Sequence, residues 1–241
     1  MAAKQSPGLA AQKARLIARA AKSGALATVR RGTGTKAGQP YVSKVGVALD
    51  IDGSPVFLFS TLAAHTQDLL ADPKASLLLE AVCDTTNPLE TARTTLVGRI
   101  ERLSPDQDEY ERARYLAHHS GAAMYANFGD FSLWRMTVEK VHYVGGFGLS
   151  KWAKASDYRT PLLDLKDHQA NIVDGLNEQK KQQLGPAIAK ETGCSAKGWS
   201  VSSIDPDGLN LLHLKGNTAR LNFKSPATNL RGWQDRLKRL F

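Results

Sequence analysis

The fold is decided by residues 41–79, which read YVSKVGVALDIDGSPVFLFSTLAAHTQDLLADPKASLLL. Two apolar runs in this stretch, Tyr41–Leu49 and Pro55–Ser60, flank an Asp52-Gly53 turn. Apolar runs on both sides of a glycine turn are typical of a β-hairpin. The stretch therefore predicts two antiparallel strands, with Val45 and Val47 facing one side of the first strand.

A polar loop follows the second of these strands and leads into a short helix predicted over Thr66–Leu70. Ser60, Thr61, His65 and Thr66 place three hydroxyls and an imidazole beside the start of that helix. Free backbone N–H groups and the positive end of the helix dipole favour an anion there. Our hypothesis is that a ligand phosphate binds in this loop. The alternative, that these side chains only cap the helix and form the turn, stays open.

Further strands extend the pattern on both sides of this stretch. They are predicted, from their apolar content or alternation, over Ala25–Arg30, Ala75–Val82, Arg93–Leu103 and Phe131–Val144. The run Ala75–Val82 is continuously apolar, so we expect both of its faces to be covered. Mostly hairpin connections, rather than repeated strand–helix–strand units, indicate an antiparallel sheet that closes or nearly closes into a barrel.

Helices are predicted between and before these strands. A helical apolar spacing covers Leu9–Ser23, and Gly24 is expected to end that helix. Ser104 caps a second helix that runs to about Leu116, with proline and acidic residues in its first turn. The segment His118–Phe128 is expected to be helical or irregular.

The tail has a different pattern, which predicts a small α+β domain. A polar stretch at Lys151–Thr160 is taken as the boundary, which divides the chain into residues 1–152 and 161–241. A helix is expected over Leu163–Leu184, broken by Gly185-Pro186. The remaining predicted elements are a helix over Ala187–Thr192, a three-stranded meander over Trp199–Ile204, Leu209–Leu214 and Ala219–Phe223, and a basic amphipathic helix over Pro226–Phe241.

The composition is that of an ordinary globular protein with an excess of positive charge. Lys and Arg number 32 against 23 Asp and Glu, which gives a net charge of +9 and favours anionic partners. Without a basic stripe interleaved with aromatic residues, nucleic-acid binding is disfavoured. We find no membrane-spanning run and no secretory signal, so a cytoplasmic location is expected. Cys83 and Cys194 are expected to be reduced thiols.

Several motifs resemble one known family. They are Gly38–Ser43, the Ser60–Thr66 loop, Asp72-Pro73 with Ser76, Leu96–Ile100, Tyr125–Phe131 and Gly145–Gly148. Together they resemble the flavin-binding split-barrel superfamily, which includes pyridoxamine 5′-phosphate oxidase. The closer likeness is to its haem-utilisation (HugZ-like) branch, in which a small α+β domain follows the barrel. The resemblance implies a split β-barrel with that C-terminal domain, and a homodimer with flavin mononucleotide (FMN) sites at the subunit interface.

The resemblance also implies positions for FMN. The oxidases hold the phosphate with an arginine and a lysine that fall here on Ser43 and near Ala48, so both basic residues are missing. Lys44 and Arg99, on strands expected to be neighbours, are candidates to supply the charge, or are solvated strand residues. Trp134 could stack on the flavin ring, as Tyr125 could, or lie in the core. This pattern argues against oxidation of pyridoxamine phosphate.

The haem-utilisation branch implies a different ligand set, which this chain only partly keeps. A helix reading like His-Met-Asn-x-Asp-His opens the tail domain in that branch, and Asn177 alone remains of it within residues 175–180. Haem oxygenase members also use a histidine near the C-terminus, and this chain has none after His213. Both losses count against a haem site of the usual kind.

The sequence leaves three hypotheses and names no catalytic residue. His118 and His119 are adjacent and cannot both face one metal from a regular element, so no metal site is predicted. The first hypothesis is an FMN-dependent oxidoreductase that acts on a small molecule, in which the cofactor carries the chemistry. The second is a haem-binding or haem-degrading protein. The third is a non-catalytic dimeric adaptor whose basic C-terminal helix binds a protein partner.

Overall fold

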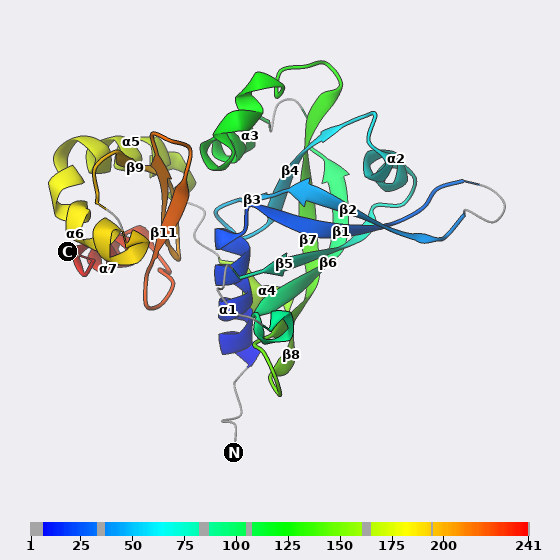
Figure 1. The fold of residues 1–241 in the computed structure, drawn as a ribbon, viewed down its shortest axis with the longest axis horizontal. Helices are drawn as coiled ribbons and strands as arrows, with labels where there is room; N and C mark the ends of the chain where they lie inside the picture. Colours follow the sequence, from blue (N-terminus) through cyan, green and yellow to red (C-terminus); the bar gives the residue numbers. More distant parts are fainter. Residues whose placement is uncertain are drawn as a thin grey trace.

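The computed structural model describes residues 7–32, 37–81, 87–104, 108–160, 165–193 and 195–240. Within these ranges the chain forms an eight-stranded sheet and a separate three-stranded sheet (Figure 1). Every strand pair in both sheets is antiparallel. The large sheet curls into a half-barrel, which confirms the predicted fold class.

The large sheet has the strand order β2-β1-β5-β6-β7-β4-β3, with β8 paired to β7. Its strands, from β1 to β8, are Ser23–Val29, Pro40–Gly46, Ala48–Leu49, Pro55–Ser60, Lys74–Glu80, Arg93–Arg102, Phe131–Val144 and Ser150–Lys154. The helices of this part are α1 (Pro7–Ala20), α2 (Ala64–Ala71), α3 (Asp108–His118) and α4 (Ala155–Tyr158), with 3₁₀ turns η2 (Pro88–Glu90) and η4 (Ser120–Met124).

Helix α1 packs against the large sheet with a face of small side chains. Ala10, Ala11, Ala14 and Ala18 are all fully buried in the same apolar cluster as Leu26 of β1. Alanine has no side chain beyond Cβ, so the helix axis can approach the strands closely at little cost in side-chain entropy. The helix lies on the side of the barrel that faces the second sheet (Figure 1).

The C-terminal part forms around its own apolar cluster. Its sheet has the order β11-β10-β9, and its strands are β9 (Trp199–Asp205), β10 (Gly208–His213) and β11 (Thr218–Asn222). Its helices are α5 (Leu165–Gln179), α6 (Lys181–Thr192) and α7 (Leu230–Lys238). Trp233 of α7 is almost fully buried there and donates from Nε1 to the Asp205 carbonyl at 2.9 Å. The division at residues 152 and 161 stays a prediction.

The two parts meet at a buried cluster of charged side chains, which we call the ionic junction: Arg15, Arg19, Arg114, Asp205, Asp207 and Arg220. Arg15 donates to both carboxylate oxygens of Asp207, at 2.8 and 2.9 Å. Arg220 does the same to Asp205, at 2.7 Å for each bond. Arg19 lies between the two carboxylates, 3.4 Å from Asp205 and 3.3 Å from Asp207. Each of the six side chains is at most 6% exposed.

Carbonyl oxygens balance the excess of arginine in the ionic junction. Four arginines face two aspartates, and further guanidinium donors bond to backbone oxygens or to the side-chain amides of Gln169, Asn210 and Asn222. Arg19 donates to the Ile51 carbonyl at 2.6 Å, and Arg114 donates to the Leu49 and Ile204 carbonyls at 2.7 and 2.9 Å. Burial alone would raise the pKa of Asp205, but Arg19 and Arg220 hold that pKa far below its usual range.

The turn at residues 50–53 also ties the two parts together. Arg135 of β7 pairs with Asp50 and, at 2.8 Å, with Asp52. Ile51 at the tip is 1% exposed and packs into the apolar cluster of the C-terminal part. The predicted Asp52-Gly53 turn is confirmed, and it is also a contact between the two parts.

His118 and His119, at the end of α3, lie against the barrel. The Nε2 atom of His118 is 3.1 Å from the Ala21 carbonyl, and that of His119 is 2.9 Å from the Val47 carbonyl. Burial, and then the neighbouring His119, lower the pKa of His118 to about 4. Both rings therefore act as neutral donors to backbone oxygens near neutral pH.

Four sequence predictions about local structure are wrong. Gly24 lies inside β1, because α1 ends earlier, at Ala20. The strand predicted over Tyr41–Leu49 divides into β2, which pairs with β1, and β3, which pairs with β4. The strand over 75–82 was predicted to be buried on both faces, but in β5 buried residues alternate with half-buried ones. The helices near Gly185-Pro186 break at Lys180 instead, and both residues lie inside α6.

The polar stretch Lys151–Thr160, taken as the boundary, has regular structure. Its first half belongs to β8, where Ala153 pairs with Val141 of β7. Its second half forms α4, whose Tyr158 is fully buried and donates to the Gly53 carbonyl at 3.0 Å. Most side chains of β8 are exposed or half-buried, which explains the polar composition.

Two predicted strands are confirmed and one predicted helix starts later, while both cysteines lie outside the described residues. The strands over Pro55–Ser60 and Phe131–Val144 have the predicted bounds. The final helix begins later than predicted, at Leu230, with Asn229 as its N-cap. Cys83 and Cys194 lie outside the described residues. No helix in the described ranges is long and apolar enough to cross a membrane.

Candidate functional site

The loop between β4 and α2 lies against the segment that enters β7. Ser60, the last residue of β4, pairs with Phe131, the first of β7. The Thr61 amide donates to the Asp130 carbonyl at 2.8 Å, and Gln67 of α2 donates to the Thr61 carbonyl at 2.6 Å. These bonds fix the loop, so the side chains that follow it have defined positions.

His65, in the first turn of α2, is a neutral and half-buried imidazole. Its ring packs edge-on against Phe59, with 4.6 Å between the ring centroids. Burial lowers the pKa of His65, and the charge of Asp68 opposes that shift. No hydrogen bond to its ring exists within the described part of the chain. Both ring nitrogens are therefore available to a ligand.

Four of the other described histidines differ from His65 in this respect. The rings of His118 and His119 contact backbone oxygens, His142 contacts the Ser150 hydroxyl at 2.8 Å, and His213 contacts the Lys197 carbonyl. His168 has no bonded ring nitrogen among the described residues either, but it is exposed on α5. His65 thus combines a free ring with a protected position.

Thr66 presents an unpaired hydroxyl next to His65. Its side chain is fully buried, and its Oγ1 has no hydrogen-bond partner in the described structure. A buried hydroxyl without a partner costs about 1–3 kcal/mol. The backbone N–H of Thr66 donates to the Ala63 carbonyl at 3.1 Å, so its hydroxyl is the group that a ligand atom could satisfy.

Asp130 makes the same loop less suited to an anion. Its carboxylate accepts a hydrogen bond from the Ser60 hydroxyl at 2.5 Å, and the Leu62 amide donates to that hydroxyl at 3.1 Å. Ser60 is thereby engaged within the protein, and a negative charge lies beside the proposed phosphate position. The side chains of His65 and Thr66 have no partner in the described structure, whereas the Ser60 hydroxyl is already hydrogen-bonded.

One large apolar side chain of this loop is exposed. Leu62 is 86% exposed, and the nearby His65 is half-buried. The segment before Asp130 packs elsewhere: its Ala126 clusters with Leu58, on the face of β4 opposite to Phe59, and Tyr125 packs against Phe131. We call Leu62, His65 and Thr66 the His65 patch.

The remaining predicted site residues do not join the His65 patch. Ser43 and Lys44 are successive residues of β2 and so point to opposite faces of the sheet. Ser43 is on the face of the buried Val45, while Lys44 lines an outer groove with Val42. The two residues cannot both contact one phosphate from these positions.

Arg99 is also distant from the loop. The prediction that Lys44 and Arg99 lie on neighbouring strands is wrong, because β1 and β5 separate β2 from β6. Arg99 pairs with Thr137, six residues along β7 from Phe131, which is roughly 20 Å of strand. Its side chain lies 3.9 Å from Glu101 on the same strand.

Trp134 is a core residue in this structure. It is 2% exposed, its Nε1 donates to the Ser132 hydroxyl at 3.1 Å, and its ring lies 6.1 Å from that of Phe59. No face of the ring is open to a flat ligand. Trp134 supports the site only indirectly, because it packs against the phenylalanine on which His65 rests.

Asn177, the one residue kept from the haem-branch motif, has a structural role. Its amide donates to the Val201 carbonyl at 2.9 Å and accepts from the Val201 amide at 2.8 Å. It thus pairs with the free edge of β9. In the described ranges, no group of three His, Cys, Asp or Glu side chains is placed to hold a metal ion.

The fold agrees with what similar proteins show. A family model described as the CREG β-barrel matches residues 5–160. The chain belongs to this family. The match includes β8 and α4, the segment whose composition was taken as the boundary. The expected membership of the split-barrel group is confirmed.

Three similar proteins cover most of the chain. The non-canonical heme oxygenase HOZ of Arabidopsis thaliana, named as chloroplastic, is 31% identical over 196 residues, which are 78% of this chain and 60% of that protein. A protein of unknown function from Agrobacterium tumefaciens is 26% identical, with a TM-score of 0.78 over 99% of this chain and 98% of that one. A heme binding protein from Mycobacterium smegmatis is 29% identical, with a TM-score of 0.59 over 99% and 97%.

Proposed function

We propose that this protein binds haem at the His65 patch, with the His65 imidazole as the iron ligand. The observation that carries the proposal is a neutral, half-buried imidazole with no hydrogen-bond partner among the described residues, in the same loop as the exposed Leu62. Neutral imidazole is a common haem ligand, and an apolar surface suits the flat macrocycle. Bound haem supplies an iron centre that can bind oxygen or exchange an electron.

The relatives support haem over the other candidates. Two of the three similar proteins are named for haem: a heme binding protein that matches this chain over nearly its whole length, and a heme oxygenase. This chain spans only 60% of that heme oxygenase, so oxygenase activity here is a separate proposal that haem binding does not require.

His65 and Leu62 have separate roles in this proposal. His65 would bind the iron, and the edge-on contact with Phe59 would keep the imidazole from rotating. Leu62, which is 86% exposed, would cover part of the macrocycle. A single chain leaves this surface open, so we propose that a second copy encloses it, in line with the predicted homodimer.

FMN is the second candidate, and one observation favours it. The Thr66 hydroxyl is buried and unpaired in the first turn of α2, where a phosphate oxygen could accept its hydrogen bond. Asp130 beside the same loop opposes an anion, and Ser43 and Arg99 lie elsewhere. These features make the phosphate site weaker than the resemblance implied.

Absorbance titration of the purified protein with ferric haem and with FMN tests both candidates. We expect a Soret band that saturates with haem at micromolar concentration. His65→Ala should raise the Kd for haem at least tenfold and shift the band. His168→Ala, which removes the other histidine ring with no bonded nitrogen in the described ranges, should change neither.

Two outcomes would contradict the haem proposal. A Soret band that is the same in His65→Ala and in the unchanged protein would remove His65 as the ligand. Tight FMN binding that is lost in Thr66→Val, without any Soret band, would establish the second candidate instead. If neither ligand binds, the predicted adaptor role with a protein partner becomes the explanation to pursue.

A further inference from the structure

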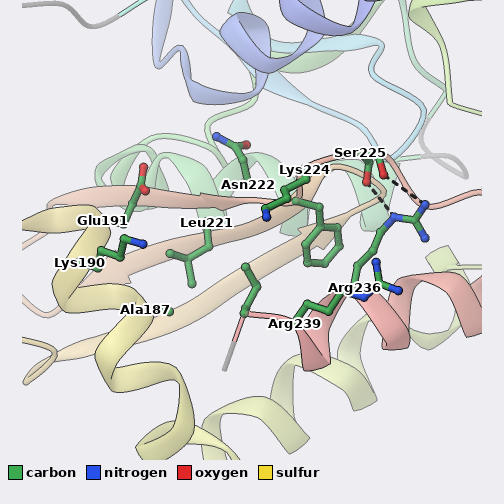
Figure 2. A pocket seen from close by; sticks show the side chains of 11 residues that line it. Ala187, Lys190, Glu191, Leu221, Asn222, Lys224, Ser225, Arg236 and Arg239 are labelled. Atoms are coloured by element: carbon green, nitrogen blue, oxygen red, sulfur yellow. Dashed lines mark hydrogen bonds between the residues drawn. The ribbon is translucent and has the colours of Figure 1, made fainter.

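A cavity lies wholly within the C-terminal part, away from the His65 patch. It has a volume of about 390 Å³ and is enclosed by α6, β11 and α7. Cavities of a few hundred Å³ are the usual size for small-molecule sites. Figure 2 shows Ala187 and Lys190 on α6 at one side, Arg236 and Arg239 at the end of α7 at the other, and Leu221 of β11 between them.

The floor of this cavity is apolar. Leu221 and Phe223 come from β11 and the residue after it, and both are almost fully buried. Ala187 of α6 and Leu240, which follows α7, complete the apolar lining. Phe223 is held in place by Trp233, whose ring meets it edge-on at 5.7 Å between centroids. The floor is therefore a rigid surface that would bind the apolar body of a ligand.

The rim is cationic. Lys190, Lys224, Arg236 and Arg239 line the cavity, with Glu191 as the one acidic residue among its lining side chains. The C-terminal ends of α6 and α7 add a partial negative charge of about half a unit each, which still leaves a positive balance. Lys190, Lys224 and Arg239 form no ion pair within the described ranges. They are free to pair with an incoming anion.

Arg236 is held rigidly at this rim. Its Nε donates to the Ser225 carbonyl at 2.8 Å and its Nη2 to the Ser225 hydroxyl at 3.4 Å (Figure 2). Its Nη1 donates to the Gly232 carbonyl at 2.9 Å. A guanidinium fixed in this way offers its remaining donors in a defined direction, which suits the two oxygens of a carboxylate. Arg239, one turn along, provides a second guanidinium.

We propose that this cavity is a second binding site, which takes a small organic molecule with one carboxylate and an apolar body. The carboxylate pairs with Arg236 and Arg239, and the apolar body lies on Leu221 and Phe223. The site is independent of the His65 patch and of any haem, because none of its lining residues belongs to the barrel.

The experiment is a titration of the full chain, labelled with ¹⁵N, with octanoate, followed by amide shifts in NMR spectra. Shifts should be confined to α6, β11, α7 and the residues between β11 and α7. Arg239→Gln should raise the Kd about tenfold, the usual effect of losing one charge-assisted hydrogen bond. Acetate, which has the same head group without the apolar body, should bind at least tenfold more weakly than octanoate.

Matched variants distinguish binding in the cavity from nonspecific attraction between charges. Arg231→Gln removes an exposed arginine of α7 that does not line the cavity, and it should change the Kd less than twofold. Ala187→Phe fills the cavity without a change in charge and should abolish binding. Equal losses in Arg231→Gln and Arg239→Gln, or unchanged binding in Ala187→Phe, would overturn the proposal. Arg239 is exposed, so its variant folds even if the filled cavity does not.

Discussion

The polar groups of the ionic junction have partners within the protein, whereas two polar groups of the His65 patch do not. In the junction, charges are buried and paired: Asp205 alone receives two bonds from Arg220 and lies 3.4 Å from Arg19. In the patch, the His65 ring and the Thr66 hydroxyl have no partner among the described residues. Satisfied buried groups hold a structure together, whereas an unsatisfied one is a cost that a ligand can remove.

The largest expected effect tests the junction. Asp205→Asn leaves Arg19, Arg114 and Arg220 without their shared carboxylate inside the protein. Removal of one partner from a buried ion pair costs about 3–5 kcal/mol, so the free energy of unfolding should fall by that amount. Urea denaturation followed by tryptophan fluorescence measures it.

A surface pair is the control for this experiment. Glu101 lies 3.9 Å from Arg99, and both side chains are substantially exposed. Glu101→Gln should change the free energy of unfolding by less than about 0.5 kcal/mol. If Asp205→Asn costs no more than Glu101→Gln, the junction does not hold the two parts together, and the comparison fails.

The next largest expected effect is a loss of folding stability at low pH. The folded-state pKa of His118 is about 4, below the ordinary value of 6.5, so the unfolded chain binds more protons between these values. Stability should therefore be complete above pH 6.5 and fall as the pH drops toward 4. The loss between pH 7 and pH 5 should be about 2 kcal/mol.

Urea midpoints at pH 7 and pH 5 check this prediction, with His118→Asn as the variant that lacks the titrating group. Asp205 keeps its charge throughout this range, because its pKa is far below the usual value. The variant should lose less stability than the unchanged protein over the same interval. An identical loss in both would assign the pH dependence to other groups.

The smallest effect contrasts two threonines. Thr28 of β1 donates to the buried carboxylate of Asp68 at 3.1 Å, whereas Thr66 two residues before that aspartate has no partner for its hydroxyl in the described structure. Thr28→Val should cost about 1–3 kcal/mol, because the bond to a charged group is lost. Thr66→Val should be neutral or slightly stabilising.

Thermal denaturation of the two valine variants gives the comparison directly. A lower Tm for Thr28→Val alone would show that the Thr66 hydroxyl is dispensable for folding, as expected for a group kept for a ligand. Equal destabilisation of both would mean that Thr66 has an unseen partner in the free protein, and the contrast between the two regions would weaken.

Local patterns in the sequence predicted a large part of the fold. The bounds of β4 and β7 follow from alternation and turn residues, and the loop at Ser60–Thr66 follows from the change of pattern after β4. The position of Ser43 and Lys44 on opposite faces was also readable from the strand period. Asp130 could not be linked to the loop without knowledge that β4 and β7 are partners.

The wrong predictions concern segments in which contacts with distant residues outweigh the local sequence propensity. Gly185-Pro186 would end an isolated helix, but Leu184 and Ile188 on either side are both buried in the C-terminal core, and this packing carries α6 through the proline. The stretch Lys151–Thr160 is polar by composition, yet β7 offers an open edge that β8 completes. In both cases tertiary packing overrode the local signal.

The sequence by itself determined the strands, the turn at residues 50–53 and the polar loop before α2, because each depends on neighbours along the chain. Only the tertiary structure decided which distant residues those elements contact. Ile51 at the tip of the turn enters the C-terminal core, and Arg15 meets Asp207 across 192 residues of chain. Such contacts have no period or spacing in sequence, because they form only when two separately folded surfaces meet.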